Sequence, residues 1–177
     1  MAHFADLTFY TYSGDRWPTA KNVGWLKQGH AFPTAAPSEE TLDLLWQFCS
    51  APVMKMRGIH ACDLCETRQA TYVERNGVKL LLGHSEIRVF SAESSADSLR
   101  RALEQTESGG LISLQRSPVP FSIYAAPTLV YHYVEAHHYS PPEDFLRALR
   151  EGLQPTTPEY FELLRKLEIS HDGFRPL

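Results

Sequence analysis

The sequence predicts an α+β fold, in which a small antiparallel β-sheet packs with several helices in a single domain. Alternating apolar and polar residues around a hairpin turn fill the middle of the chain, and apolar residues at helical spacing lie before and after this part. The length of 177 residues suits one globular domain, and the hydrophobic fraction of 43% is sufficient for a core that needs no metal or disulfide. We therefore expect residues 1–177 to form one domain.

The first part of the chain is expected to differ from the rest. Residues 1–37 carry scattered aromatic residues and turn formers, which predict an irregular segment with short strands whose aromatics cover one edge of the core. Residues 38–177 then form the α+β core. Its first helix is expected to begin after Ser38, because serine caps helix N-termini and apolar residues follow at helical spacing as far as Cys49. Pro52 ends this helix.

The region from about residue 59 to residue 90 is expected to be antiparallel β-structure. The pair Asn76-Gly77 predicts a hairpin, because both residues tolerate the positive φ angles of a type I′ turn. A further alternating run follows Gly83 and places Glu86 and Arg88 on one strand face, where we expect them to pair in contact with solvent. The expected strands span residues 70–74, 78–82 and 85–90.

The last part of the chain is expected to be mainly helical. Pro127 suits the first turn of a helix, where its missing N–H is harmless, and Pro141-Pro142 precedes another helical stretch. The expected elements are a short helix through Leu99 and Leu103, strands at 111–114 and 121–124, and helices at 127–138, from 141, and at 160–167.

Charge and composition argue against several classes of protein. The net charge is −4, the pI is near 6.0 and no run of Lys or Arg exceeds two residues, so nucleic acid is not the expected partner. No stretch approaches the roughly 20 apolar residues of a membrane helix, and the N-terminus lacks the basic and apolar regions of a signal peptide. We expect a cytoplasmic protein whose partner is another protein rather than a membrane.

The three cysteines point to a metal. An odd number in a reducing compartment argues against a disulfide framework, and Cys49 lies in an apolar run where it is expected to be buried. Cys62 and Cys65 form a CxxC pair, and His60 lies two positions before it, on the same side of an extended segment. Because thiolates are soft ligands and imidazole is borderline, His60, Cys62 and Cys65 predict a zinc site. A redox pair is an alternative, although no thioredoxin-like βαβ unit is apparent.

The fourth ligand is expected to come from the helix at 127–138. His132 lies next to the apolar face that contains Leu129, so we favour His132 over His137, which comes at the helix end. The two histidines are five positions apart, which separates them by about 140° on an ideal helix. One alternative is that the helix unwinds near its end, both helix histidines bind and His60 lies outside the ligand set. His84 as a ligand, or His132 as a hydrogen-bonded core residue, are further alternatives.

Several segments of the chain, in order, carry a family resemblance. They span residues 22–26, 29–33, 57–65, 82–89, 124–134 and 137–145, and they contain the motifs HxCxxC, LGxxEIRV and YAAPxLxYHYVxxHxYxPP. The chain resembles an uncharacterised family of soluble bacterial proteins of similar length, a domain of unknown function. The resemblance implies a shared fold and a shared His/Cys site, without a reaction, substrate or partner. In relatives a glycine often follows the second cysteine, where this chain has Glu66.

Two functions fit a zinc site of this kind. The first is a non-catalytic, metal-stabilised binding or accessory protein, for example of the immunity type, in which the aromatic N-terminal segment supplies recognition side chains. The second is a small zinc hydrolase with three protein ligands, a bound water and Glu86 as general base. The coordination number separates the two, because four protein ligands close the site and three leave a position for water.

Overall fold

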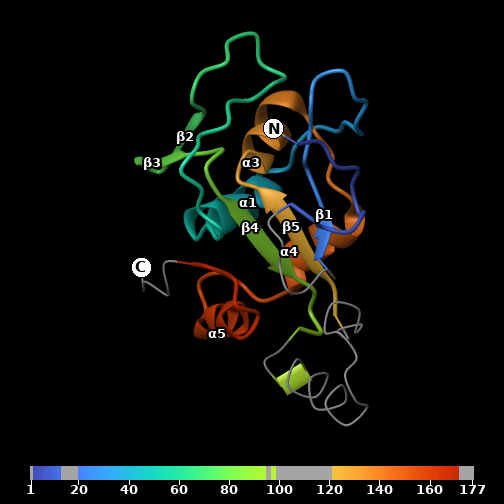
Figure 1. Cartoon of the computed structure of the whole chain (residues 1–177), viewed down its shortest axis with the longest axis vertical. Helices are drawn as coiled ribbons and strands as arrows, with labels where there is room; N and C mark the ends of the chain where they lie inside the picture. The colour runs from blue at the N-terminus through green and yellow to red at the C-terminus, as the bar shows by residue number, and fades with distance from the viewer. Residues whose placement is uncertain (1, 13–19, 95–96, 99–120, 172–177) are drawn as a thin grey trace.

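A computed structural model describes residues 2–12, 20–94, 97–98 and 121–171 of the chain. Within these residues the fold is α+β, as predicted, with four helices, a three-stranded sheet and a separate two-stranded sheet (Figure 1). None of the described helices has the length and apolar character needed to span a bilayer. The helix expected through Leu99 and Leu103 and the strand expected at 111–114 lie outside the described residues.

The three-stranded sheet forms the centre of the fold. Strand β5 (Ile123–Pro127) lies between β1 (Ala20–Asn22) and β4 (Glu86–Phe90), and every residue of β4 and β5 is buried. β5 pairs antiparallel with β4 but parallel with β1, so the sheet contains one parallel pair beside the expected antiparallel pairing. A parallel neighbour needs a long connection, and here the chain between β1 and β5 contains α1, the hairpin and β4.

Glu86 and Arg88 on β4 form the expected ion pair, but the pair is buried rather than solvated. Their side chains are 1% and 0% exposed, and Arg88 Nη1 donates to Glu86 Oε2 over 2.6 Å. The Tyr10 hydroxyl donates to the same carboxylate at 2.8 Å, and the Tyr10 ring lies 4.7 Å from the guanidinium carbon. Because all five residues of β4 are buried, both faces of the strand are covered and the alternation in its sequence does not mark a solvent face.

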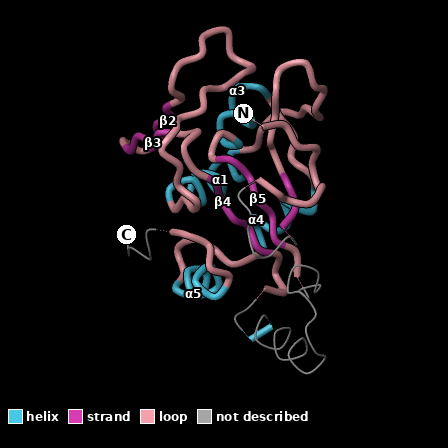
Figure 2. The backbone as a smooth tube through the Cα atoms, viewed as in Figure 1, coloured by secondary structure: helices cyan, strands magenta, loops and turns pink. Residues whose placement is uncertain are grey.

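The predicted hairpin is confirmed, and it stands away from the central sheet (Figure 2). Strands β2 (Tyr72–Arg75) and β3 (Val78–Leu81) pair antiparallel around Asn76 and Gly77, whose φ angles are +51° and +75°. Positive φ at both turn residues is the type I′ geometry that Asn-Gly favours. Arg75 ties the hairpin to the first helix by donating to Glu39 over 2.9 Å.

The helices pack beside the central sheet and follow most of the predicted spans. Ser38 caps the first helix as expected, because its hydroxyl accepts a hydrogen bond from the Thr41 backbone N–H at 3.1 Å. Phe145 and Leu149 bury the apolar face of a later helix, also as expected. The described helices are α1 (Glu39–Ser50), α3 (Val130–His137), α4 (Glu143–Glu151) and α5 (Pro158–Lys166).

The helix expected at 127–138 begins later than predicted. Pro127 is the last residue of β5, paired with Glu86, and not a residue of the first helical turn. The strand expected at 121–124 extends to this proline, because the small residues that follow Tyr124 also fit the buried sheet. Thr128 and Leu129 then form a turn into α3. The later start leaves α3 only eight residues long, which matters for its two histidines.

Gly83 holds the segment that leads into the CxxC pair, so its replacement by alanine is expected to be strongly destabilising. Its φ is +84°, and a Cβ atom there would lie 2.1 Å from the His60 carbonyl oxygen. Left-handed strain and this backbone clash together should lower the free energy of unfolding by about 2–4 kcal/mol, measured by urea denaturation. Gly77→Ala is the matched control, because Gly77 also has positive φ but has no atom within 4 Å of the added Cβ. Equal losses in both variants would contradict the clash.

Candidate metal centre

Four metal-ligating side chains from two distant segments meet in one place. Cys62 and Cys65 lie in the loop before β2, and His132 and His137 lie on α3. One ligand atom from each side chain can be chosen so that all four atoms lie within 4.8 Å of one another. Cys62 is buried and the other three are partly buried. This cluster can hold a metal ion.

The cysteine loop is positioned by a short chain of hydrogen bonds to the start of α3. The His60 backbone N–H donates to the Gly83 carbonyl at 2.8 Å, and the Gly83 N–H donates to Thr128 Oγ1 at 3.0 Å. Within the loop, the Leu64 N–H donates to Cys62 Sγ at 3.3 Å, which folds the CxxC segment back on itself. The two segments that carry the cluster are therefore joined through Gly83 before any metal is considered.

The histidines converge because of the direction of their side chains and the end of the helix. His137 is the last residue of α3, and His138 leaves the helical conformation with φ +54° and ψ +26°. Helical side chains lean toward the N-terminus, so the His137 ring leans back along the helix toward His132. The two ring centres are 5.0 Å apart, although the residues are five positions apart in the sequence.

The distances within the cluster suit a tetrahedral ion. Cys65 Sγ lies 3.2 Å from His132 Nε2 and 3.4 Å from His137 Nε2, and Cys62 Sγ lies 3.3 Å from His137 Nε2. A tetrahedron with metal–sulfur bonds of about 2.3 Å and metal–nitrogen bonds of about 2.0–2.1 Å separates sulfur from nitrogen by about 3.5 Å. The three sulfur–nitrogen distances are slightly shorter than this separation, so small shifts of these atoms would accommodate an ion.

Burial sets the protonation of the cluster in the absence of metal. Burial is the main cause that raises the pKa of Cys62 to about 11, and the neighbouring Cys65 thiol contributes to this rise. Burial, followed by the nearby His137, lowers the pKa of His132 to about 4, and burial also lowers the pKa of His137. The Cys62 thiol is therefore protonated, and the imidazoles of His132 and His137 are neutral, at pH 7. A divalent cation would displace the thiol protons, because a coordinated thiol ionises.

The structure places the predicted residues as follows. Cys62, Cys65 and His132 belong to the cluster, and His137 is its fourth member. His60 is not a member, and its backbone N–H bonds to Gly83 beside the loop. This arrangement corresponds to the alternative in which His132 and His137 both bind the metal and His60 lies outside the ligand set. Which side chains coordinate an ion stays a prediction.

Glu86 is not a member of the cluster. Both of its carboxylate oxygens accept hydrogen bonds from Tyr10, and one also accepts from Arg88. A general base must reach the water that it activates. The buried and bonded carboxylate therefore gives the hydrolase hypothesis no support.

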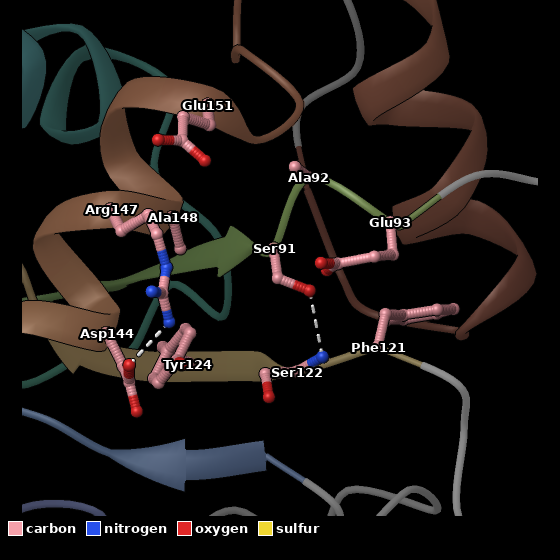
Figure 3. A pocket seen from close by; sticks show the side chains of 10 residues that line it. All are labelled: Ser91, Ala92, Glu93, Phe121, Ser122, Tyr124, Asp144, Arg147, Ala148 and Glu151. Carbon is pink, nitrogen blue, oxygen red and sulfur yellow. Dashed lines mark hydrogen bonds and ion pairs between the residues drawn. The ribbon is translucent and has the colours of Figure 1, made fainter.

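A cavity of about 390 Å³ lies beyond the C-terminal end of β4, beside α4 (Figure 3). Ser91 Oγ accepts a hydrogen bond from the Ser122 N–H at 3.0 Å, and Arg147 pairs with Asp144 at 2.6 Å on its wall. Its acidic side chains do not come together as a metal-ligand group. The cavity is separate from the cysteine and histidine cluster.

One of three comparisons with known proteins gives a match. The model of a protein family, described as Domain of unknown function (DUF7919), matches residues 2–99 and 100–150. No curated protein and no solved structure matches the chain. The match covers all four members of the cluster, and the predicted resemblance to a family of unknown function is confirmed.

Proposed function

We propose that this chain, which belongs to the DUF7919 family, binds one zinc ion and is a non-catalytic, metal-stabilised binding protein. The proposed ligands are Cys62, Cys65, His132 and His137. The observation that carries the proposal is the convergence of four protein ligand atoms within 4.8 Å. Two thiolates and two imidazoles form the closed tetrahedral set of structural zinc sites, whereas catalytic sites keep one position for water.

The chemistry of the donors supports zinc over other common ions. Magnesium and calcium prefer oxygen ligands, and no carboxylate belongs to the cluster. Thiolate ligands must stay reduced, and the three cysteines are free thiols. We therefore also propose the cytoplasm as the compartment in which the protein works.

A binding role is supported by apolar side chains exposed around the cysteine loop. Within the aromatic N-terminal segment, Tyr10 and Trp25 are each only 1% exposed, whereas Phe9 is 70% exposed and is available for contact with another protein. Ile59, Tyr72 and Val78 are 52%, 53% and 52% exposed; Ile59 precedes the cysteine loop in the sequence, and the other two lie on the hairpin that follows it. Apolar side chains of this kind suit contact with another protein. Zinc would fix the loop that lies between them.

The test is the metal content and coordination of the purified protein. We expect close to one equivalent of zinc, and X-ray absorption should show two sulfur and two nitrogen ligands without oxygen. Three protein ligands with one oxygen would contradict the closed site and return the hydrolase to consideration. Absence of any bound transition metal after zinc is supplied would contradict the proposal itself.

Removal of the metal is expected to destabilise the protein without unfolding it. A zinc ion that joins the loop at Cys65 to His132 closes a long loop, so its loss should lower the free energy of unfolding by about 3–4 kcal/mol. The melting temperature should fall by about 10 °C. Circular dichroism of chelated protein should keep its helical signal at room temperature, because a large apolar core is buried independently of the site. Complete loss of that signal would contradict this expectation, and added zinc should restore the melting temperature.

A further inference from the structure

Tyr133 is a buried side chain beside the cluster whose polar atom is unexplained. It is 0% exposed, and its hydroxyl finds no hydrogen-bond partner in the described part of the chain. Buried polar groups are nearly always hydrogen-bonded, and an unpaired one is destabilising. The unpaired Tyr133 hydroxyl would be explained by a hydrogen-bond acceptor that is present only in another state of the protein.

The position of Tyr133 beside the cluster indicates that this state is the metal-bound one. Tyr133 lies beside His132 on α3 and one turn before His137, and its ring centre is 6.2 Å and 6.3 Å from theirs. His137 Nε2 in turn lies 3.3 Å from Cys62 Sγ and 3.4 Å from Cys65 Sγ. The Tyr133 side chain therefore lies next to the two histidines that face the sulfur atoms, which metal binding would ionise.

We propose that the Tyr133 hydroxyl donates a hydrogen bond to the Cys62 thiolate once the metal is bound. This inference rests on the proposed zinc site. A protonated thiol is a weak acceptor, whereas a thiolate carries the negative charge that makes a hydrogen bond strong. Cys62 is 1% exposed, so no bulk water competes for its sulfur. Metal binding thus supplies the acceptor that the hydroxyl lacks.

Such a contact would make Tyr133 a positioning residue outside the ligand set. Hydrogen bonds to metal ligands hold them in orientation, and their loss typically weakens metal affinity by about 10–100-fold. A donor to sulfur also lowers the energy of the sulfur lone pairs. The energy of a charge-transfer transition from sulfur to metal therefore reports directly on this hydrogen bond.

The experiment is Tyr133→Phe, which removes only the hydroxyl oxygen, with zinc and cobalt as the probes. The variant should bind zinc about 10-fold more weakly by competition with a chelator. Without metal, its melting temperature should rise by about 3 °C, because the unpaired hydroxyl is gone. With cobalt in place of zinc, the sulfur-to-cobalt band should move to longer wavelength. A role in packing alone would not change the metal-free and metal-bound proteins in opposite directions.

Tyr131→Phe is the matched control on the same helix. Tyr131 is also buried, at 2% exposed, but its hydroxyl already donates to Glu135 at 3.3 Å. Zinc affinity and the cobalt band of this variant should equal those of the wild type. If Tyr133→Phe binds zinc as the wild type does and leaves the cobalt band unmoved, the inference is wrong while the zinc site stands. If the wild type binds neither metal, the proposed function fails as well.

Discussion

Replacing both Cys62 and Cys65 by serine is expected to reduce the zinc content of the purified protein from close to one equivalent to none. Serine has nearly the same shape, but its hydroxyl stays protonated at neutral pH and is a hard ligand. The remaining two imidazoles do not make a zinc site. The free energy of unfolding should fall by about 3–4 kcal/mol, as after chelation, because both treatments remove the same cross-link. Mass spectrometry of the metal and urea denaturation measure these two effects.

Cys49 provides the control for this experiment. It is 4% exposed, its thiol donates to the Thr128 carbonyl at 3.6 Å, and it is not a member of the cluster. Burial raises its pKa to about 12, so it stays a neutral thiol. Cys49→Ser should therefore keep its zinc, whatever its effect on stability. Full zinc content in the Cys62/Cys65 double variant would show that the metal binds elsewhere.

Local signals in the sequence predicted most of the secondary structure. Ser38 and Asn76-Gly77 act through neighbours within four residues, so their roles follow from the sequence alone. The surroundings of β4 depend on distant partners. Tyr10, which bonds to Glu86, is 76 residues away from it, and β1 pairs with β5 across most of the chain. Periodicity within one strand carries no information about such partners, which is why the buried ion pair was expected at the surface.

The sequence predicted only part of the cluster, because local signals again identify neighbours in the chain but not distant partners. Cys62 and Cys65 are close in sequence, and their spacing alone brings them together. The angular argument that His132 and His137 would not both reach one ion used an ideal helix and ignored the lean of helical side chains toward the N-terminus. The chain did contain a signal, because Pro141-Pro142 requires the helix to end soon after His137. His60 was favoured by strand alternation, but its segment pairs with Gly83.

Alanine substitutions at the histidines are expected to give the second large effect. His132→Ala and His137→Ala should each weaken zinc binding by more than about 100-fold, because loss of a ligand exceeds the loss of an outer contact. Both Nε2 atoms lie within 3.4 Å of Cys65 Sγ, and His137 Nε2 also lies 3.3 Å from Cys62 Sγ. Competition with a chelator of known affinity measures each dissociation constant, and cobalt spectra report the change in coordination.

Two other histidines, His60 and His138, provide the controls for the substitutions at His132 and His137. His60 lies close to the cysteines in sequence and His138 follows His137, yet neither belongs to the cluster. His60→Ala and His138→Asn should bind zinc within about threefold of the wild type; asparagine is chosen at His138 because it tolerates the φ of +54°. A large loss of zinc affinity in His60→Ala, with no loss in His137→Ala, would favour the ligand set expected from strand alternation. If only the variants of His132 and His137 lose zinc affinity, the zinc site is assigned to the cluster that joins α3 to the cysteine loop.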